Sequence, residues 1–163
     1  MINREEILFT GRYAAQGAEA QARCVLLVED DRSLRRYLEI LLKRAGYRVL
    51  MAADGLEAMK VLLSNAGIDV VITDAIMPNL NGRELCRFIK NTPQLCHLPV
   101  ALLSALEPDQ SKRETHDIDA FLVKPLANEL LISCLENLLS QPRFRKVSRE
   151  SGVESPESVL VTD

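Results

Sequence analysis

The chain has 163 residues, enough for one domain of ordinary size with polar extensions, and such a domain needs no disulfide or metal to hold its core. The composition is 47% hydrophobic with no Trp and few aromatic residues, so the core must be aliphatic. The net charge of −3 argues against a dedicated nucleic-acid binder. No apolar segment has the length of a leader or a membrane span, so we expect a soluble cytoplasmic protein.

Five apolar runs bounded by turn residues predict buried strands, and they cover residues 24–28, 47–52, 68–74, 98–103 and 120–123. Helical patterns follow most of these runs. Alternating strands and helices require right-handed crossovers and a parallel sheet covered on both faces. We therefore predict the α/β class, with a doubly wound five-stranded parallel sheet in a flavodoxin-like three-layer sandwich.

Apolar residues at helical spacing predict four helices. Ser33 is the expected N-cap of the first helix and Gly46 its stop, and Asp54 opens the second. The third is expected over residues 82–90 and the fourth over residues 126–139. The predicted buried stripes are Leu34, Tyr37, Leu38, Leu41 and Ala45 in the first helix, Leu56, Met59, Leu62 and Leu63 in the second, and Leu85, Phe88 and Ile89 in the third.

The domain organisation is predicted from changes in polarity. Residues 1–22 form a polar N-terminal extension, residues 23–141 the folded domain, and residues 142–163 a polar linker or tail. The last five residues, VLVTD, echo LLVED at the first strand and fit a chain that leads into a second domain of the same kind. Residues 107–117 contain no apolar side chain, so any helix there is expected to be short, frayed or absent.

Polar side chains stand where four of the predicted strands end: Glu29, Asp30, Asp74, Ser104 and Lys124. Taken singly, they read as turn-capping acids, a core serine or a surface lysine. Because parallel strands end at the same edge of a sheet, we expect them to lie together. Three converging carboxylates repel one another unless a cation lies among them, and a hard divalent ion such as Mg²⁺ suits oxygen ligands. A carboxylate beside a cation, an ammonium and a hydroxyl suits phosphoryl transfer onto that carboxylate.

These residues, in this order, resemble the response-regulator receiver domain of two-component signalling over residues 22–140. The resemblance rests on Glu29-Asp30 in VLLVEDD, Asp74 in VVITDAIMPNLNG, Ser104, and Lys124 followed by Pro125. It implies that Asp74 accepts a phosphoryl group from a histidine kinase or a histidine phosphotransfer protein. The expected protein is thus a signalling domain rather than a dedicated enzyme.

The resemblance also implies how Mg²⁺ and the phosphoryl group are held. Asp30 and Asp74 would bind the ion directly, together with the backbone carbonyl of Ile76, and Glu29 would act through water. Lys124 would pair with the phosphoryl oxygens, and its bond to the following proline is often cis in the family.

The remaining implied roles concern switching and output. Ser104 would hydrogen-bond the attached phosphoryl group, and Phe121 would be the aromatic residue that moves with it. The output is expected to pass to a partner protein or a further domain. The polar character of residues 107–117 weakens the usual dimer face, so a monomer or weak homodimer is expected, with no nucleic acid or membrane as partner.

Three other readings compete with this one. A degenerate receiver would only bind proteins, although every acid, hydroxyl and lysine position is filled. A phosphatase of the dehalogenase type requires a second carboxylate two residues after the nucleophile, where this chain has Ile76. A flavodoxin-like nucleotide binder requires a glycine-rich phosphate loop, and the first strand is followed instead by acidic residues.

Overall fold

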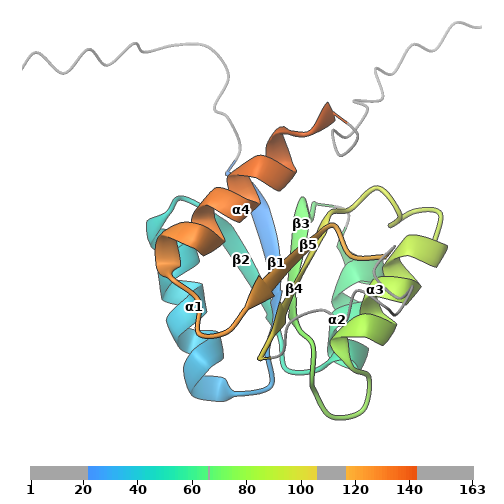
Figure 1. Ribbon diagram of the computed structural model, residues 1–163. Helices are drawn as coiled ribbons and strands as arrows, with labels where there is room; N and C mark the ends of the chain where they lie inside the picture. Colours follow the sequence, from blue (N-terminus) through green and yellow to red (C-terminus); the bar gives the residue numbers. More distant parts are fainter. Residues whose placement is uncertain (1–21, 66, 106–116, 143–163) are drawn as a thin grey trace, which may run out of the picture.

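The structure, a computed structural model, describes residues 22–65, 67–105 and 117–142. These ranges form a parallel sheet of five strands in the order β2-β1-β3-β4-β5, with helices on both faces, which confirms the predicted fold class (Figure 1). The elements in chain order are β1 Cys24–Val28, α1 Arg32–Arg44, β2 Arg48–Ala52, α2 Gly55–Ser64, β3 Val70–Asp74, α3 Gly82–Asn91, β4 Val100–Ser104, β5 Ala120–Val123 and α4 Asn128–Ser140.

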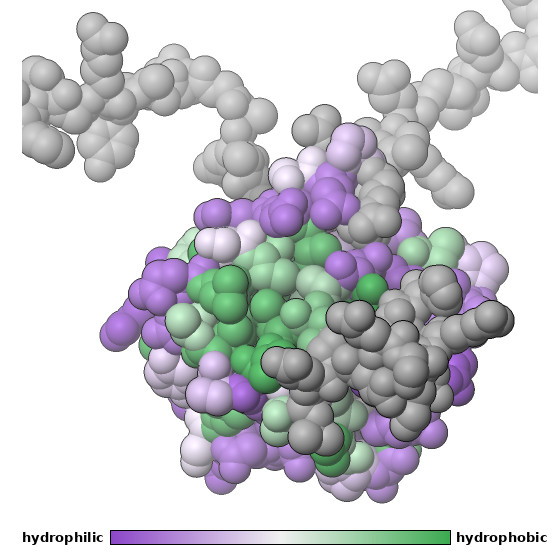
Figure 2. All heavy atoms as spheres, in the orientation of Figure 1, coloured by the Kyte–Doolittle hydropathy of each residue, from purple (hydrophilic) through white to green (hydrophobic). Residues whose placement is uncertain are grey.

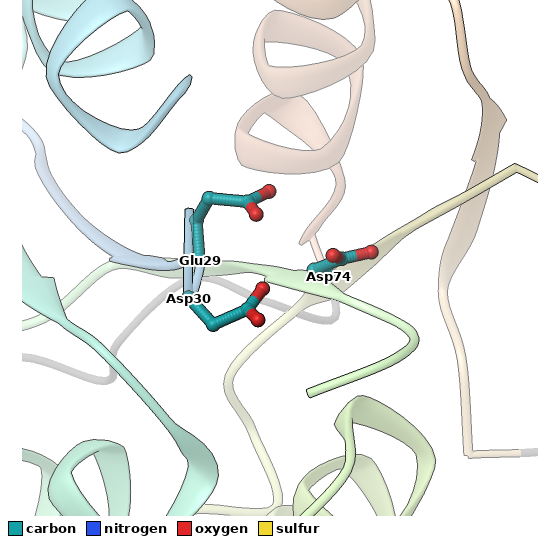
Figure 3. Close-up of side chains that lie close together, drawn as sticks. All are labelled: Glu29, Asp30 and Asp74. Carbon is teal, nitrogen blue, oxygen red and sulfur yellow. The ribbon is translucent and has the colours of Figure 1, made fainter. Parts of the chain in front are cut away.

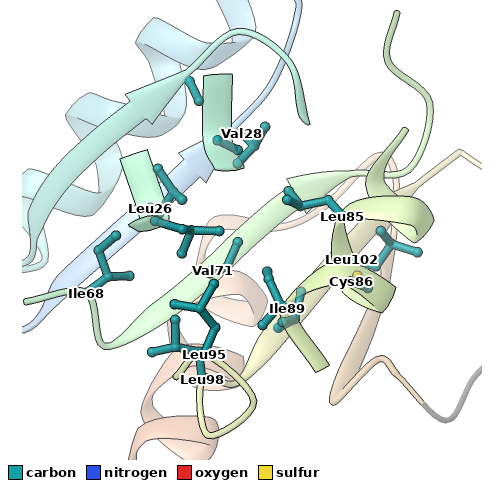
Figure 4. Packing of buried hydrophobic residues seen from close by; sticks show 14 of the residues in the cluster. Leu26, Val28, Ile68, Val71, Leu85, Cys86, Ile89, Leu95, Leu98 and Leu102 are labelled. Atoms are coloured by element: carbon teal, nitrogen blue, oxygen red, sulfur yellow. The ribbon is translucent and has the colours of Figure 1, made fainter. Parts of the chain in front are cut away.

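Two hydrophobic clusters lie on opposite faces of the sheet because successive side chains of a strand point to opposite sides. Leu26 and Val28 of β1 face one cluster, which includes Leu85 and Ile89 of α3 (Figure 4). The neighbouring residues of the same strand face the other cluster, which includes Leu38 and Leu42 of α1 and Leu131, Leu135 and Leu138 of α4. The central strands β1, β3 and β4 are therefore covered on both sides.

The N-cap of α1 is Asp31 and not the predicted Ser33. The Asp31 carboxylate accepts a hydrogen bond of 2.7 Å from the Leu34 amide, which leaves Ser33 inside the first turn. At α3, Asn81 and Glu84 form a capping box, each side chain accepting from the backbone amide of the other. The predicted element bounds otherwise differ by small amounts: β3 begins at Val70 rather than at residue 68, and α4 at Asn128 rather than at residue 126.

The predicted buried stripes of the first two helices were partly wrong. Tyr37, Leu56 and Leu63 are 51%, 48% and 66% exposed. In α2 the buried positions are Gly55, Ala58 and Leu62, so the helix is rotated by about one position relative to the prediction. Its first turn packs against the loop after β3, where a Cβ on Gly55 would come within 2.5 Å of the Leu80 carbonyl oxygen. Small residues therefore decide which face of α2 is buried.

Several predictions lie outside the described residues, among them the N-terminal extension, most of the polar segment 107–117, and the tail beyond residue 142. Within the described ranges, no helix has the length and apolar character needed to cross a membrane.

Candidate functional site

The carboxyl ends of β1 and β3 bring three acidic residues together. The strands are neighbours in the sheet, and carboxylate oxygens of Glu29, Asp30 and Asp74 all lie within 4.8 Å of one another (Figure 3). Glu29 is buried, Asp74 is half-buried and Asp30 is exposed, so the cluster opens toward solvent on one side. Three oxygen donors at this spacing suit a hard divalent cation such as Mg²⁺, in agreement with the prediction that these acids converge.

Lys124 reaches the same cluster from the end of β5. Its ammonium nitrogen lies 3.1 Å from Oε2 of Glu29 and 3.3 Å from Oδ2 of Asp74. Its amide donates a hydrogen bond of 2.7 Å to the Ser104 carbonyl, which ties the residue to the end of β4. The peptide bond from Lys124 to Pro125 is cis, as the resemblance implied.

Burial and the neighbouring charged groups shift the pKa values of Glu29 and Lys124. Burial is the main reason why the pKa of Glu29 is raised; the hydrogen bond from Lys124 opposes this shift and the negative charge of Asp74 adds to it. Burial alone would lower the pKa of Lys124, but its hydrogen bond to Glu29 and the charges of Glu29 and Asp74 outweigh burial and raise it. Lys124 therefore stays protonated at neutral pH, and its ammonium contacts two of the three acids.

The other predicted site residues lie on β4, on β5 and in the loop after β3. Ser104 is buried at the end of β4, opposite Val123 of β5. Phe121 is half-buried, pairs with Leu102 and packs against the α2 and α3 side of the sheet. Ile76 lies in the loop after β3, and its side chain is 69% exposed.

The loop between β3 and α3 is held by close backbone contacts. The Gly82 amide donates a hydrogen bond of 3.1 Å to the Ala75 carbonyl, and a Cβ on Gly82 would lie 2.0 Å from the Asp74 carbonyl oxygen. Asn79 has a φ of 65°, and its side-chain amide donates a hydrogen bond of 3.0 Å to Asp54, the N-cap of α2. The loop is thereby fixed to both helices of one face.

Arg35 of α1 is a contact that the sequence analysis missed. Its guanidinium NH1 donates hydrogen bonds to the backbone carbonyls of Glu29 and Asp30. The sequence places four arginines in this helix at positions 32, 35, 36 and 44, and nothing distinguishes this one from a solvated surface residue. Arg35 lies four residues after the N-cap Asp31, and this position in α1 puts its guanidinium within reach of the loop after β1.

An apolar pocket adjoins the site on the face of the sheet that α1 and α4 cover. It lies between α1 and the start of α4, and its lining includes Leu34, Tyr37, Leu126, Leu131 and the lysine that reaches the carboxylates. Figure 2 shows apolar side chains gathered over this face of the molecule. The Tyr37 hydroxyl crosses from α1 to α4, where it donates a hydrogen bond of 2.8 Å to the Asn128 side chain.

The fold and the acidic edge define a class of protein: doubly wound α/β domains that carry their site beyond the carboxyl ends of the parallel strands. Residues 25–136 match the family model of the response regulator receiver domain. The chain therefore belongs to the response regulator receiver domain family, as the resemblance predicted.

Relatives and solved structures agree with this assignment. The response regulator MprA of Mycobacterium sp. (strain KMS) is 35% identical over 134 residues, which cover 81% of this chain and 55% of the relative, so this chain spans about half the length of that protein. The structure of the chemotaxis protein CheY4 of Vibrio cholerae superposes with a TM-score of 0.67 at 32% identity. The superposition covers 72% of this chain and 99% of the CheY4 chain. The structure of the response regulator TrrA from Thermotoga maritima, in complex with Mg²⁺ and BeF, has a TM-score of 0.66 at 28% identity. The superposition covers 72% of this chain and 99% of the TrrA chain.

Proposed function

We propose that residues 23–141 form a phosphoacceptor receiver domain and that Asp74 takes the phosphoryl group from a phosphohistidine. The observation that carries this proposal is the convergence of three carboxylates and one ammonium at the end of the central strand β3. An Asp74 oxygen would form the new bond to phosphorus while the bond from phosphorus to the histidine nitrogen breaks and the imidazole recovers its proton. The donor would be a histidine kinase or a histidine phosphotransfer protein.

In this proposal Mg²⁺ is held by Asp30 and Asp74 with the carbonyl of Ile76, and Glu29 acts through water. When bound, the ion supplies positive charge for the transferring oxygens. Lys124, which contacts Glu29 and Asp74, would supply a second positive charge to a group on Asp74. The oxygen-only donor set supports a hard cation, and the Mg²⁺ in the TrrA structure supports the same choice.

The proposed switch involves Ser104 and Phe121, both on the strands beyond β3. Ser104 would hydrogen-bond the attached phosphoryl group, and Phe121 would follow as the end of β4 moves inward. The backbone link from the Lys124 amide to the Ser104 carbonyl couples these two strand ends. The outcome would be a change in contacts with an output protein or domain, through a shift between two pre-existing conformations.

The test is phosphorylation by a small-molecule donor such as acetyl phosphate in the presence of Mg²⁺, followed by intact-protein mass. We expect one phosphoryl group on the wild type and none on Asp74→Asn. The matched control is Asp69→Asn, which removes a carboxylate near the opposite end of the same strand and should leave phosphorylation intact. A phosphoryl group retained by Asp74→Asn would overturn the assignment, and a wild type that is never modified would support a receiver that only binds proteins.

A further inference from the structure

The backbone on either side of Asp30 is anchored by one side chain. The Glu29 and Asp30 carbonyls belong to the two peptide units that flank the Asp30 Cα, and both accept hydrogen bonds from NH1 of Arg35. Because each peptide unit is planar, fixing the two units fixes φ and ψ of Asp30, and with them the direction in which its side chain leaves the backbone.

Asp30 depends on this anchor more than the other two acids do. Glu29 is buried and also held through its carboxylate, which accepts from Lys124 and from the Asp31 amide. Asp74 lies at the end of a central strand and contacts Lys124. Asp30 is exposed, and within the described ranges its carboxylate has no hydrogen-bond or ion-pair partner. The backbone therefore sets the direction of its Cα–Cβ bond, and with it the rotamers that bring the carboxylate toward Asp74.

We propose that Arg35 is a positioning residue for the magnesium site, holding the loop after β1 so that the Asp30 carboxylate faces Asp74. This inference rests on the proposed function, because it concerns the same metal. It concerns a guanidinium that would act through the backbone carbonyls of two acids. Removing a group that hydrogen-bonds to a metal ligand and orients it typically lowers metal affinity by about ten- to hundredfold.

A purely electrostatic role for Arg35 would have the opposite sign. A positive charge near a cation site repels the cation, so removing that charge alone would tighten Mg²⁺ binding. Removing an anchor loosens the ligand and weakens binding. The direction of the change in Mg²⁺ affinity therefore separates the two roles.

The experiment is calorimetric titration of the full chain with MgCl₂. Arg35→Met keeps a long side chain without the donor, and we expect its Kd for Mg²⁺ to rise about ten- to hundredfold. The matched control is Arg36→Met, the next residue of the helix, which pairs with Glu39 and is exposed. Its Kd should stay within about threefold of the wild type because exposed charges are screened.

A second variant and a second measurement guard against misfolding. Arg35→Gln removes the charge with a residue of similar helix propensity, and it should also weaken Mg²⁺ binding if Arg35 positions the loop. Phosphorylation at saturating Mg²⁺ should approach the wild-type rate, since the loss lies in metal affinity. An unchanged or lower Kd in either folded variant overturns the positioning role while leaving Asp74 as the acceptor. A wild type that binds no Mg²⁺ overturns this inference together with the metal assignment.

Discussion

At the scale of single residues, the site holds more negative charge than its lysine can offset. Lys124 contacts Glu29 and Asp74, yet the pKa of Glu29 is still raised, chiefly by burial and further by the charge of Asp74. Asp30 adds a third carboxylate within 4.8 Å. The metal-free fold therefore carries a repulsion that the proposed cation would remove.

Removing one of these charges should stabilise the metal-free protein. In Asp30→Asn we expect the free energy of unfolding without Mg²⁺ to rise by about 1 kcal/mol, the size of one screened repulsion at this distance. With free Mg²⁺ at about a hundred times its Kd, the wild type should gain about 2.7 kcal/mol, and the variant should gain far less because it has lost a ligand. Urea unfolding with chelator or with Mg²⁺ measures both quantities. A metal-free variant less stable than the wild type would contradict the repulsion.

At the scale of elements, the contact between α3 and β3 depends on one missing methyl group. The helix begins at Gly82, directly against the Asp74 carbonyl oxygen. No other residue fits without moving the first turn of α3 or the end of β3. The acceptor strand and the helix thus share a fixed distance.

Gly82→Ala should therefore shift the acceptor as well as the helix. We expect a loss of about 1–3 kcal/mol in the free energy of unfolding, the usual cost of an extra methyl in a packed region, together with slower phosphorylation. The control is Gly67→Ala, where a Cβ meets only the end of the Arg48 side chain, at 3.0 Å. Equal free energies of unfolding of the two variants in urea would contradict this, because α3 could then move away from the Asp74 carbonyl with no loss of stability.

The strands were more predictable than the helix boundaries, for a physical reason. A buried parallel strand is a continuous apolar run, so residues 24–28 and 120–123 were read correctly from local sequence. A helix start depends on which side chain reaches a free amide. Both Ser33 and Asp31 could do so at α1, and the fold uses Asp31. The rotation of α2 depends on Leu80, which is distant in sequence and could not be foreseen.

The site was predictable to the extent that its residues mark strand ends. Glu29, Asp30 and Asp74 were placed together because parallel strands end at one edge, and the structure brings them together. The contact from Arg35 was missed because it joins a side chain to backbone carbonyls. Every residue has a carbonyl, so the sequence does not indicate which ones accept from a side chain. The link between Asn79 and Asp54 was missed for a related reason, since both look like ordinary turn residues.

At the scale of the whole molecule, the two clusters protect the cysteines to different degrees. Cys24 and Cys86 are completely buried in one cluster, and burial raises the pKa of Cys86 to about 12. Cys134 is half-buried, and burial raises its pKa as well. Cys96 is exposed. These differences make thiol reactivity a measure of how tightly each part of the fold is closed.

Labelling with a disulfide reagent near pH 8 should give one fast thiol, Cys96, and a slower one, Cys134. Cys86 should react only as fast as the fold opens, because a pKa three units above the ordinary value leaves about a thousandfold less thiolate. Cys24 should behave in the same way because it is buried. In Cys96→Ser the fast phase should disappear, and a fast phase that persists would show that the core is open.

The two faces of the sheet also differ in how much of the chain each requires. The cluster under α2 and α3 is assembled from buried residues between Cys24 and Leu102. The cluster under α1 and α4 includes Val25 near its beginning and Leu138 near its end. On the ribosome, the first face can therefore be complete while the last helix is still inside the exit tunnel. Until Leu131 and Leu135 emerge, the strand side chains of the second face are covered by α1 alone. The part of this face that awaits α4 is the surface that a nascent-chain chaperone would meet.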